Sequence, residues 1–548
     1  MSAATVPAPA GFLERERIVA RPGFSRWLVP PAALAIHLCI GMAYGFSVFW
    51  LPLSKAIGIT KPVACPATAG LLDYLTTTSC DWKVALLQSW IYGLFFVFLG
   101  SSAALWGGWL ERVGPRKAGI VAAFCWCGGI LVMAFGVARH QLWIVWLGAA
   151  LGGVGLGLGY ISPVSTLIKW FPDRRGMATG MAIMGFGGGA MIGAPLADRL
   201  MKHFASPASV GVTEALLVLA AIYFVFMMGG ALGYRVPPEN WKPAGWNPDS
   251  ANKPLITAHQ VHLNVAWRTP QFWLLWSVLM LNVSAGIGIL SMASPLLQEV
   301  FAGRLIGVTA AYDQLTPAQL ASIAAIAAGF TGLLSLFNIL GRIFWASLSD
   351  RIGRKATYMV FFLLGILLYS SIPWTAAAGS LALFVLFVCI ILSMYGGGFA
   401  TIPAYLSDLF GTKMVGAIHG RLLTAWSTAG VLGPLLIGYL RQYQLDHGVP
   451  KAQVYSFTMY VLAALLALGF LCNLLVRPVA AKNYMTPAQL AQLDAEQHLV
   501  TRPATAAVAG DGTPSPGWLV AAAWLAVGIP IAWGVWVTLQ KAVILFGL

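Results

Sequence analysis

The sequence predicts an all-α membrane protein made of two similar six-helix bundles and a further transmembrane helix near the carboxyl end. Three observations predict this class. Only 9% of the 548 residues are charged, whereas soluble domains carry about 25%. Apolar runs recur along the whole chain, each near the roughly 20 residues that a helix needs to cross about 30 Å of hydrocarbon. Segments of the first half of the chain also reappear in the second half.

The apolar runs predict thirteen transmembrane helices, separated by charged or Pro/Gly-rich breaks. A polar segment rich in Pro, Ala and Gln lies between the twelfth run and the thirteenth. The predicted helices lie near residues 27–53, 84–108, 118–138, 142–170, 177–200, 212–234, 271–298, 318–347, 356–373, 380–408, 415–440, 454–476 and 517–540.

These helices divide the chain into two bundles and their connections. The first apolar run is long enough to span a bilayer and lacks a small-residue cleavage site, so we expect it to remain as a helix. The expected parts are a cytoplasmic amino-terminal segment (1–26), a first six-helix bundle (27–235), a central cytoplasmic loop (236–270), a second six-helix bundle (271–476), a cytoplasmic linker (477–516) and the thirteenth helix with its tail (517–548).

The formal net charge of +15 reflects the distribution of Lys and Arg in the loops. These residues lie in short loops between apolar runs and form no continuous basic face, which argues against nucleic acid as a partner. Placing the amino terminus and every second loop in the cytoplasm assigns most of the cations to that side, as the positive-inside rule requires. We therefore predict a multi-pass protein of a bacterial inner membrane, with a cytoplasmic amino terminus and a periplasmic carboxyl terminus.

An internal repeat relates the two predicted bundles. The second and third helices are joined by GGWLERVGPRK (107–117), and the eighth and ninth by ASLSDRIGRK (346–355). A shift of 239 residues superposes Glu111 on Asp350, and the same shift superposes matching residues in two other segments without a gap. Duplicated halves of this kind are typical of alternating-access carriers whose binding site lies near the middle of the bilayer.

These segments resemble the major facilitator superfamily, whose loop signature G-x-x-x-D-R-x-G-R-K is nearly matched by SLSDRIGRK and more loosely by WLERVGPRK. Within it, similarity to the oxalate/formate antiporter group and its monocarboxylate transporter relatives is carried by YGFSVFWLPL (44–53), SPVSTLIKWFPDRRGMATGMAIMGFGGGAMIGAPL (162–196) and LLTAWSTAGVLGPL (422–435). The resemblance covers residues 27–476 and implies the major facilitator fold, with two bundles related by a pseudo-two-fold axis. The thirteenth helix lies outside this pattern.

Arg342 is the first candidate for a substrate-binding residue. It precedes Asp350 by eight positions, which places it about 12 Å from the end of the eighth helix and close to the middle of the bilayer. A guanidinium at that depth costs on the order of 3 kcal/mol, so it should face a cavity or a partner. Its planar fork of donors suits a carboxylate. The predicted spans hold almost no acidic residue at comparable depth, which favours a substrate over a structural ion pair.

The resemblance also bears on the charge of the substrate. In the oxalate/formate group an arginine at this helix position contacts the carboxylate substrate, and Asn338 lies one turn from Arg342 on the same face. That group carries a second cation, a lysine, in the eleventh helix, where this sequence has Trp426. One cavity cation neutralises one negative charge, whereas a dianion would keep a net charge in a low dielectric. We therefore predict a monocarboxylate such as formate, lactate, pyruvate or acetate.

Four aromatic residues are candidates for the wall of the binding site. Each lies at mid-depth in the first, fourth, tenth or eleventh helix, and these four helices line the cavity in facilitator folds. Aromatic walls with a few hydrogen-bonding tips suit a small-molecule pocket. The alternative for each one singly is ordinary packing between helices. The four residues are Tyr44, Tyr160, Tyr395 and Trp426.

Protons are a further candidate partner. His37 lies ten residues into the first predicted helix, and an imidazole titrates near neutral pH, so a proton relay through this residue is one hypothesis. The alternative is a histidine that is hydrogen-bonded to a neighbouring helix and takes no part in transport.

The repeated loops carry a cluster of charges that predicts a cytoplasmic gate. Ion pairs between the two halves would hold one state of a carrier, and breaking them would release it. The alternative is that the charges serve only to set the topology. The segments FPDRRG (171–176) and FGTKMVG (410–416) look like the matching turns in the other helix pairs. The predicted gate residues are Glu111, Arg112, Arg116, Lys117, Asp350, Arg351, Arg354 and Lys355.

Two of the seven cysteines, Cys65 and Cys80, fall in the long first external loop, where an oxidising periplasm would permit a disulfide. Two free thiols are the alternative. No cysteine has the spacing of a metal site, so we expect neither a metal nor a cofactor.

Together these features predict a secondary transporter that moves small monocarboxylates across the inner membrane by alternating access, as a functional monomer in the lipid bilayer. One alternative is an oxalate/formate-type anion exchanger. A proton-driven drug or metabolite exporter of the same fold would usually have a buried Asp or Glu in the first half, and none is evident there. A non-transporting receptor or assembly factor would need a larger extramembrane domain than loops 54–83 and 236–270 provide. No nucleophile and base are spaced as in an enzyme.

Overall fold

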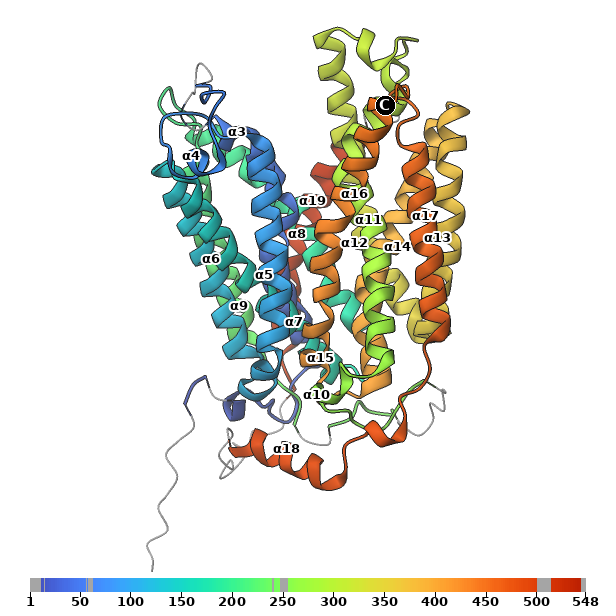
Figure 1. Ribbon diagram of the computed structural model, residues 1–548. Coiled ribbons are helices and arrows are strands. Elements are labelled where there is room, and N and C mark those ends of the chain that lie inside the picture. Colours follow the sequence, from blue (N-terminus) through green and yellow to red (C-terminus); the bar gives the residue numbers. More distant parts are fainter. Residues whose placement is uncertain are drawn as a thin grey trace, which may run out of the picture.

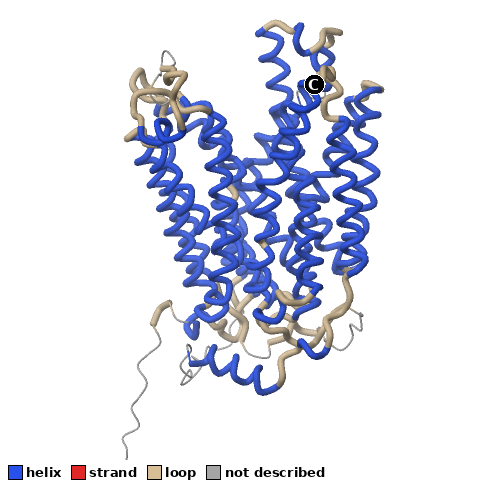
Figure 2. The backbone as a smooth tube through the Cα atoms, in the orientation of Figure 1, coloured by secondary structure: helices blue, strands red, loops and turns tan. Residues whose placement is uncertain are grey.

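The computed structural model describes residues 11–13, 15–55, 57, 63–238, 241–246, 255–499 and 514–543. Every named secondary-structure element within these ranges is a helix, as Figure 2 shows. In the same ranges, thirteen helical segments are long and apolar enough to cross a membrane. The predicted class, an all-α membrane protein with thirteen spans, is confirmed.

The first bundle contains the first six spans (Figure 1). Its first span is interrupted: four short elements follow one another in place of the single helix expected over 27–53. These are α1 (Val29–Ile40), α2 (Met42–Gly45), η3 (Phe46–Phe49) and α3 (Trp50–Ser54). The other five spans are α5 (Val84–Val113), α6 (Pro115–Ala138), α7 (Leu142–Trp170), α8 (Arg175–Phe204) and α9 (Val212–Gly233).

The second bundle lies beside the first and contains the next six spans (Figure 1). Its helices are α11 (Pro270–Phe301), α12 (Pro317–Ile352), α13 (Arg354–Ala377), α14 (Leu381–Phe410), α15 (Val415–Leu422) with α16 (Thr424–Asp446), and α17 (Ser456–Leu475). Three shorter α-helices of the described ranges lie outside the spans: α4 (Leu71–Thr76), α10 (Leu263–Ala266) and α18 (Pro487–Leu499).

The repeated loops fold alike in the two bundles. Helices α5 and α12 continue beyond their predicted ends until Gly114 and Gly353, where φ is +86° and +89°. Glycine adopts a positive φ without the steric cost that a Cβ would impose, so it ends both helices at equivalent positions of the repeat. The turn residues of the motif thereby place Glu111 and Asp350 on the last turns of α5 and α12.

The two ends of the molecule are named here by their chemistry. The basic end carries Glu111, Asp350 and the neighbouring arginines and lysines of the repeated loops, and it lies at the bottom of Figure 1 with α10 and α18. The disulfide end carries Cys65 and Cys80 and lies at the top, with α3 and α4.

The two bundles meet mainly along α5 and α8 of the first bundle. Helix α8 packs on α12 and α14, and α5 packs on α15 and α16. Small residues allow this approach: a Cβ added to Gly180 of α8 would lie 2.7 Å from the carbonyl oxygen of Arg342. The thirteenth span, α19 (Gly517–Ala542), packs against α1, α8 and α12 and therefore contacts both bundles.

Candidate functional site

Arg342 lies on α12 at the contact between the two bundles. Its side chain is 1% exposed. Nε donates a hydrogen bond to Oδ1 of Asn338 over 2.9 Å, and Nη1 donates to the carbonyl oxygen of Ile183 on α8 over 2.9 Å. Nη2 is buried and has no hydrogen-bond partner. None of the salt bridges among the described residues involves Arg342, so this buried cation keeps a free donor and no carboxylate partner.

The structure brings the predicted aromatic residues together around this arginine. The hydroxyls of Tyr44 and Tyr395 lie 3.2 Å apart and join the two bundles by a hydrogen bond. The ring of Trp426 lies 6.2 Å from that of Tyr44 and 5.1 Å from that of Tyr160. Side chains from α2, α7, α14 and α16 thus converge with Arg342 of α12 on one region.

Several polar atoms in this region have no hydrogen-bond partner. Besides Nη2 of Arg342, they include the hydroxyl of Tyr160 and Nε1 of Trp426. The Arg342 and Trp426 donors lie within interaction range of the Tyr44 hydroxyl, but their geometry falls short of a hydrogen bond. Buried polar groups nearly always have partners, so a cluster of unpartnered donors marks a place where a ligand or water can complete the bonds.

Three further residues of the site were not predicted. Phe186 lies 5.0 Å from the ring of Tyr44 and 5.2 Å from that of Trp426. Phe399 lies 4.6 Å from Trp426 and 5.8 Å from the guanidinium carbon of Arg342. His419 of α15 is buried, 5.9 Å from the ring of Tyr160, and neither of its ring nitrogens has a partner.

The sequence held a signal for two of these three residues. The 239-residue shift superposes Tyr160 on Phe399, so the repeat marks both positions. His419 is an ionisable residue inside an apolar span, and such residues usually have a functional role. Phe186 had no distinguishing signal, because an apolar aromatic in an apolar helix is ordinary.

His37 is fully buried and bonded to the backbone of two helices. Nδ1 lies in hydrogen-bond contact with the carbonyl oxygen of Ala182 on α8, and Nε2 lies 3.2 Å from the carbonyl oxygen of Tyr160 on α7. A neutral imidazole has one N–H, so it can donate to only one of these carbonyls at a time. These contacts correspond to the alternative in which the histidine is bonded to neighbouring helices.

At the basic end, two predicted gate residues bind the first turn of a helix in the opposite bundle. Oδ1 and Oδ2 of Asp350 accept hydrogen bonds from the backbone N–H groups of Gly176 and Met177, at 2.9 Å each. Oε1 of Glu111 accepts from the N–H of Gly416 over 3.0 Å. A carboxylate at a helix amino terminus is stabilised by the unpaired N–H groups and the helix dipole. These bonds connect the two bundles.

A buried ion-pair network adjoins Asp350 and was only partly predicted. Arg354 donates to Asp350 over 2.6 Å and to Asp408 over 3.1 Å. All three residues belong to the second bundle, so these two bonds do not join the bundles. Asp408 also accepts from Arg175 of α8 over 3.1 Å, so this second pair joins the bundles. Arg175 lies in FPDRRG, one of the turns noted in the sequence, whereas nothing in the sequence marked Asp408.

Two other predicted gate residues, Arg116 and Lys355, bind within their own bundle in the part of the chain that the structure describes, which differs from the expectation. The guanidinium of Arg116 donates to the carbonyl oxygens of Leu232 and Tyr234, and the ammonium of Lys355 donates to those of Leu474 and Val476. These carbonyls lie at the carboxyl ends of α9 and α17, where the helix dipole attracts cations. The side chains of Arg112 and Arg351 are exposed, and that of Lys117 is half-buried.

In the disulfide end, Cys65 and Cys80 are joined by a disulfide with their Cα atoms 5.0 Å apart. His140 lies against this bridge: Nε2 is 2.8 Å from the carbonyl oxygen of Cys80, and its ring stacks on Trp82 at 4.1 Å. Burial lowers the pKa of His140, while the bond to Cys80 and the charge of Asp81 act in the opposite direction. Across the described ranges, no group of three or more His, Cys, Asp and Glu could hold a metal ion.

Two duplicated helix bundles that enclose a buried arginine define a multi-pass membrane carrier. The sequence model of the Major Facilitator Superfamily matches residues 81–434 and 316–547. The chain belongs to the major facilitator superfamily, whose members are transporters and not enzymes.

The chain is similar to several carboxylate carriers. The oxalate:formate antiporter of Oxalobacter formigenes is 29% identical over 283 residues, which are 52% of this chain and 59% of the antiporter, so the match spans less than two thirds of that relative. The apicoplast pyruvate carrier 1 of Toxoplasma gondii is 25% identical over 457 residues, covering 70% of this chain and 78% of the carrier. Monocarboxylate transporter 11 of Mus musculus is 25% identical over 206 residues, covering 38% of this chain and 39% of that transporter.

Solved structures share the fold. The transporter FucP in its outward conformation aligns with a TM-score of 0.54 and 14% identity, covering 83% of this chain and all of FucP. The proton:xylose symporter XylE aligns with a TM-score of 0.57 and 13% identity, covering 85% of this chain and 98% of XylE.

Proposed function

We propose that the protein is a secondary active transporter of small monocarboxylates. The observation that carries the proposal is the environment of Arg342: a buried guanidinium between the bundles that has no carboxylate partner among the described residues and whose Nη2 is unpartnered. Burying a cation without a counter-ion is unfavourable. An incoming carboxylate would supply both the missing charge and the missing acceptor.

The neighbouring side chains suit one small anion. The free hydroxyl of Tyr160 and Nε1 of Trp426 are hydrogen-bond donors beside Arg342, and Phe186 and Phe399 supply apolar walls. A substrate with one carboxylate and a short apolar or hydroxylated tail matches this combination of donors and rings. The names of the relatives, an oxalate:formate antiporter, a pyruvate carrier and monocarboxylate transporters, support a carboxylate substrate.

The proposed membrane is a bacterial inner membrane, with the basic end in the cytoplasm, because the loops at that end hold most of the Lys and Arg. In that orientation the bonds of Glu111, Asp350 and Asp408 would close the cytoplasmic side. Breaking them while the opposite side closes would expose Arg342 to each compartment in turn.

A second candidate is exchange of a dianion such as oxalate, and His419 is the observation that favours it. Its two ring nitrogens have no partners in a buried position near Tyr160. Burial disfavours a charged imidazole, so only a bound anion would stabilise His419 as a second cation in the site, where Arg342 alone balances one negative charge. The same residue could instead bind the proton of a monocarboxylate symporter, so the charge of the substrate decides between the two.

Uptake into proteoliposomes tests the proposal. Radiolabelled formate, lactate, pyruvate and oxalate are presented to the wild type, Arg342→Gln and Arg342→Lys. Removing one partner of a buried charge pair costs about 2–5 kcal/mol, so we expect Arg342→Gln to lower uptake at least about 30-fold. Arg342→Lys should retain part of the uptake because it keeps the charge but not the fork.

Arg477→Gln is the matched control, since Arg477 is an exposed arginine beyond the end of α17, and its uptake should equal that of the wild type. Equal monocarboxylate uptake by wild type and Arg342→Gln would reject the proposal. Faster transport of oxalate than of the monoanions, abolished by His419→Gln, would establish the second candidate.

A further inference from the structure

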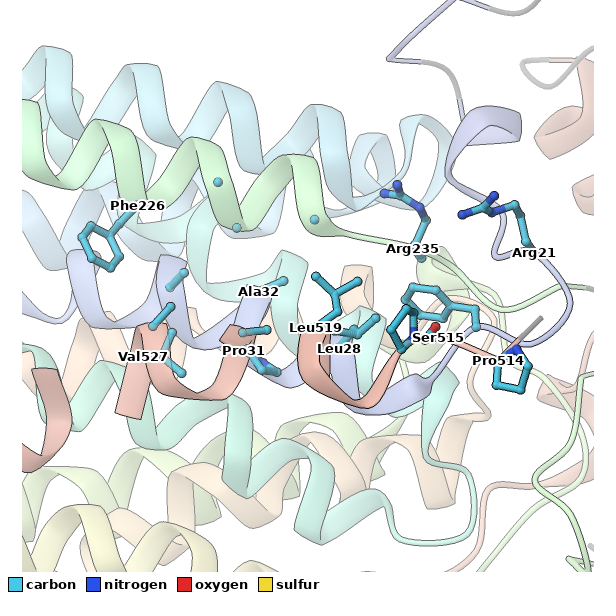
Figure 3. Close-up of a pocket in the computed structure, with 18 of the residues that line it drawn as sticks. Arg21, Leu28, Pro31, Ala32, Phe226, Arg235, Pro514, Ser515, Leu519 and Val527 are labelled. Carbon is cyan, nitrogen blue, oxygen red and sulfur yellow. The ribbon is translucent and has the colours of Figure 1, made fainter. Parts of the chain in front are cut away.

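A groove of about 690 Å³ lies on the outer face of the first bundle, where the thirteenth helix packs beside it. Its three walls are α1, α9 and α19 (Figure 3). Most of the lining is apolar, with Pro31 and Ala32 from α1, Phe226 from α9, and Leu519 and Val527 from α19. The thirteenth helix forms one of the three walls, so the groove depends on this extra helix.

Two arginines stand together at one mouth of this groove. Arg21 precedes α1 and Arg235 follows α9, and Figure 3 shows both at the same end of the groove, which is the basic end. Neither forms a salt bridge among the described residues. Burial and, to a smaller extent, the neighbouring charge of Arg21 lower the pKa of Arg235, because both disfavour the charged guanidinium.

The groove opens to the surface that would face lipid. Val225, Phe226 and Leu519 line it and are exposed apolar side chains on membrane-spanning helices. Near the arginines, Trp27 and Trp518 are also exposed, and tryptophans of this kind typically lie at the level of the lipid headgroups. The two guanidiniums are therefore at headgroup depth, and the apolar part of the groove is at acyl-chain depth.

We propose that this groove binds an anionic phospholipid, with its phosphate between Arg21 and Arg235 and one acyl chain along α1, α9 and α19. Among the described residues the two cations have no acidic partner, and the apolar channel runs from them into the hydrocarbon. This combination selects an anionic lipid, because a soluble anion would leave the channel empty and the ammonium group of a zwitterionic lipid would offset the charge of its phosphate. Basic pockets between transmembrane helices bind anionic headgroups in the same way. The site is separate from Arg342 and does not depend on the transported substrate.

Native mass spectrometry of the delipidated full-length protein tests this site. The protein is titrated with phosphatidylglycerol, with phosphatidylethanolamine of the same acyl chains, and with glycerol 3-phosphate, which carries the phosphate without a chain. We expect phosphatidylglycerol to bind most tightly. Arg21→Gln combined with Arg235→Gln should weaken its binding about 30-fold, the effect of two cations at a membrane surface, and should remove the preference over phosphatidylethanolamine.

A second variant fills the channel and leaves both arginines in place. A Cβ added to Gly229 of α9 meets no atom within 4 Å, so Gly229→Leu should fold and extend into the groove. It should weaken binding of both lipids about tenfold, the effect of losing two buried methylene groups. Gly438→Leu on α16 is the matched control, because Gly438 has equally open surroundings outside the groove; Arg477→Gln serves the same purpose for charge.

The proposal is overturned if phosphatidylglycerol binds the double arginine variant and Gly229→Leu as tightly as it binds the wild type. It is also overturned if the wild type does not distinguish the two lipids, or if glycerol 3-phosphate competes as well as the lipid. In the last case the arginines bind a soluble phosphate.

Discussion

The two ends of the molecule are held together in different ways. At the basic end, the bonds from Glu111 to Gly416, from Asp350 to α8 and from Arg175 to Asp408 all run from one bundle to the other. At the disulfide end, the disulfide, hydrogen bonds and ion pair of the described residues named below each stay within one bundle. The bridge at Cys80 and its contact with His140 belong to the first bundle.

The second bundle has its own internal pair near the disulfide end. Glu299 of α11 accepts hydrogen bonds from Arg441 of α16, and from the hydroxyl of Tyr455 over 2.7 Å. The comparison teaches that a charge has a different effect at each end. Changes to the bonds between bundles at the basic end should alter the equilibrium between two arrangements of the bundles. Changes to bonds within a bundle, at either end, should alter the stability of that bundle.

Asp408→Asn should have the largest effect, because Asp408 is the shared partner of Arg175 and Arg354 and its side chain is 6% exposed. Breaking a buried ion pair by removing one partner costs about 3–5 kcal/mol. We expect a loss of about 3 kcal/mol in thermal unfolding of the purified protein. Asp198→Asn is the control, because its pair with Lys202 is exposed and should be worth under about 0.5 kcal/mol. Equal melting temperatures for the two variants would show that the network of Arg175, Arg354 and Asp408 does not stabilise the fold more than an exposed ion pair does.

Asp350→Asn and Glu111→Gln should open the basic end to different extents. Asp350 accepts from two backbone N–H groups and Glu111 from one. A helix-terminal carboxylate is worth about 0.5–2 kcal/mol. We expect the fraction of molecules with an open basic end to rise about tenfold for Asp350→Asn and about fivefold for Glu111→Gln. The distribution of distances between spin labels at positions 112 and 351 measures this fraction. Unchanged distances in both variants would show that these carboxylates do not hold the bundles together.

Glu299→Gln should test the contrasting behaviour of the disulfide end. The change removes the charge of the pair with Arg441 while keeping an acceptor for Tyr455. We expect a loss of about 1 kcal/mol in thermal unfolding, with no change in the distance between labels at positions 112 and 351. A shift in that distance would break the comparison between the two ends.

His140 should give the smallest effect, visible as a dependence on pH. Because burial lowers its pKa in the folded protein, the unfolded chain takes up the proton first as the pH falls. Its contribution to stability is therefore present above the ordinary histidine pKa of about 6.5 and is lost below it. The melting temperature of the wild type should fall more between pH 7.5 and 5.5 than that of His140→Gln. Parallel curves would show that His140 titrates as it does in the unfolded chain.

Much of the fold followed from patterns in the sequence that membranes impose. Apolar length determined the spans, and the repeated loop placed Glu111 and Asp350 at equivalent helix ends. The interruption of the first span between Ile40 and Trp50 was not predictable, because an apolar segment has the same composition whether its helix is continuous or broken.

Residues of the site were predictable where their depth in the bilayer alone indicates that they face the protein interior. Arg342 and Tyr395 follow from their distance to the helix ends, since a polar group at mid-bilayer must face the protein interior. The pairing of Arg175 with Asp408 depends on which helices meet, and in the sequence both residues read as ordinary charges at helix ends. The contact of Arg116 with the carboxyl end of α9 was not predictable either, because only the packed structure brings that helix end beside Arg116.

Helix α19 touches α8 of one bundle and α12 of the other. If the bundles tilt in opposite senses, as the proposed alternating access requires, one helix cannot follow both of them, and each change of access would shear or separate one of these two contacts. Under that mechanism the thirteenth span would add its own increment to the free-energy difference between the two access states. A carrier with this appendage would have its turnover rate adjusted from outside the transport pathway, by whatever strengthens or weakens the attachment of that one helix.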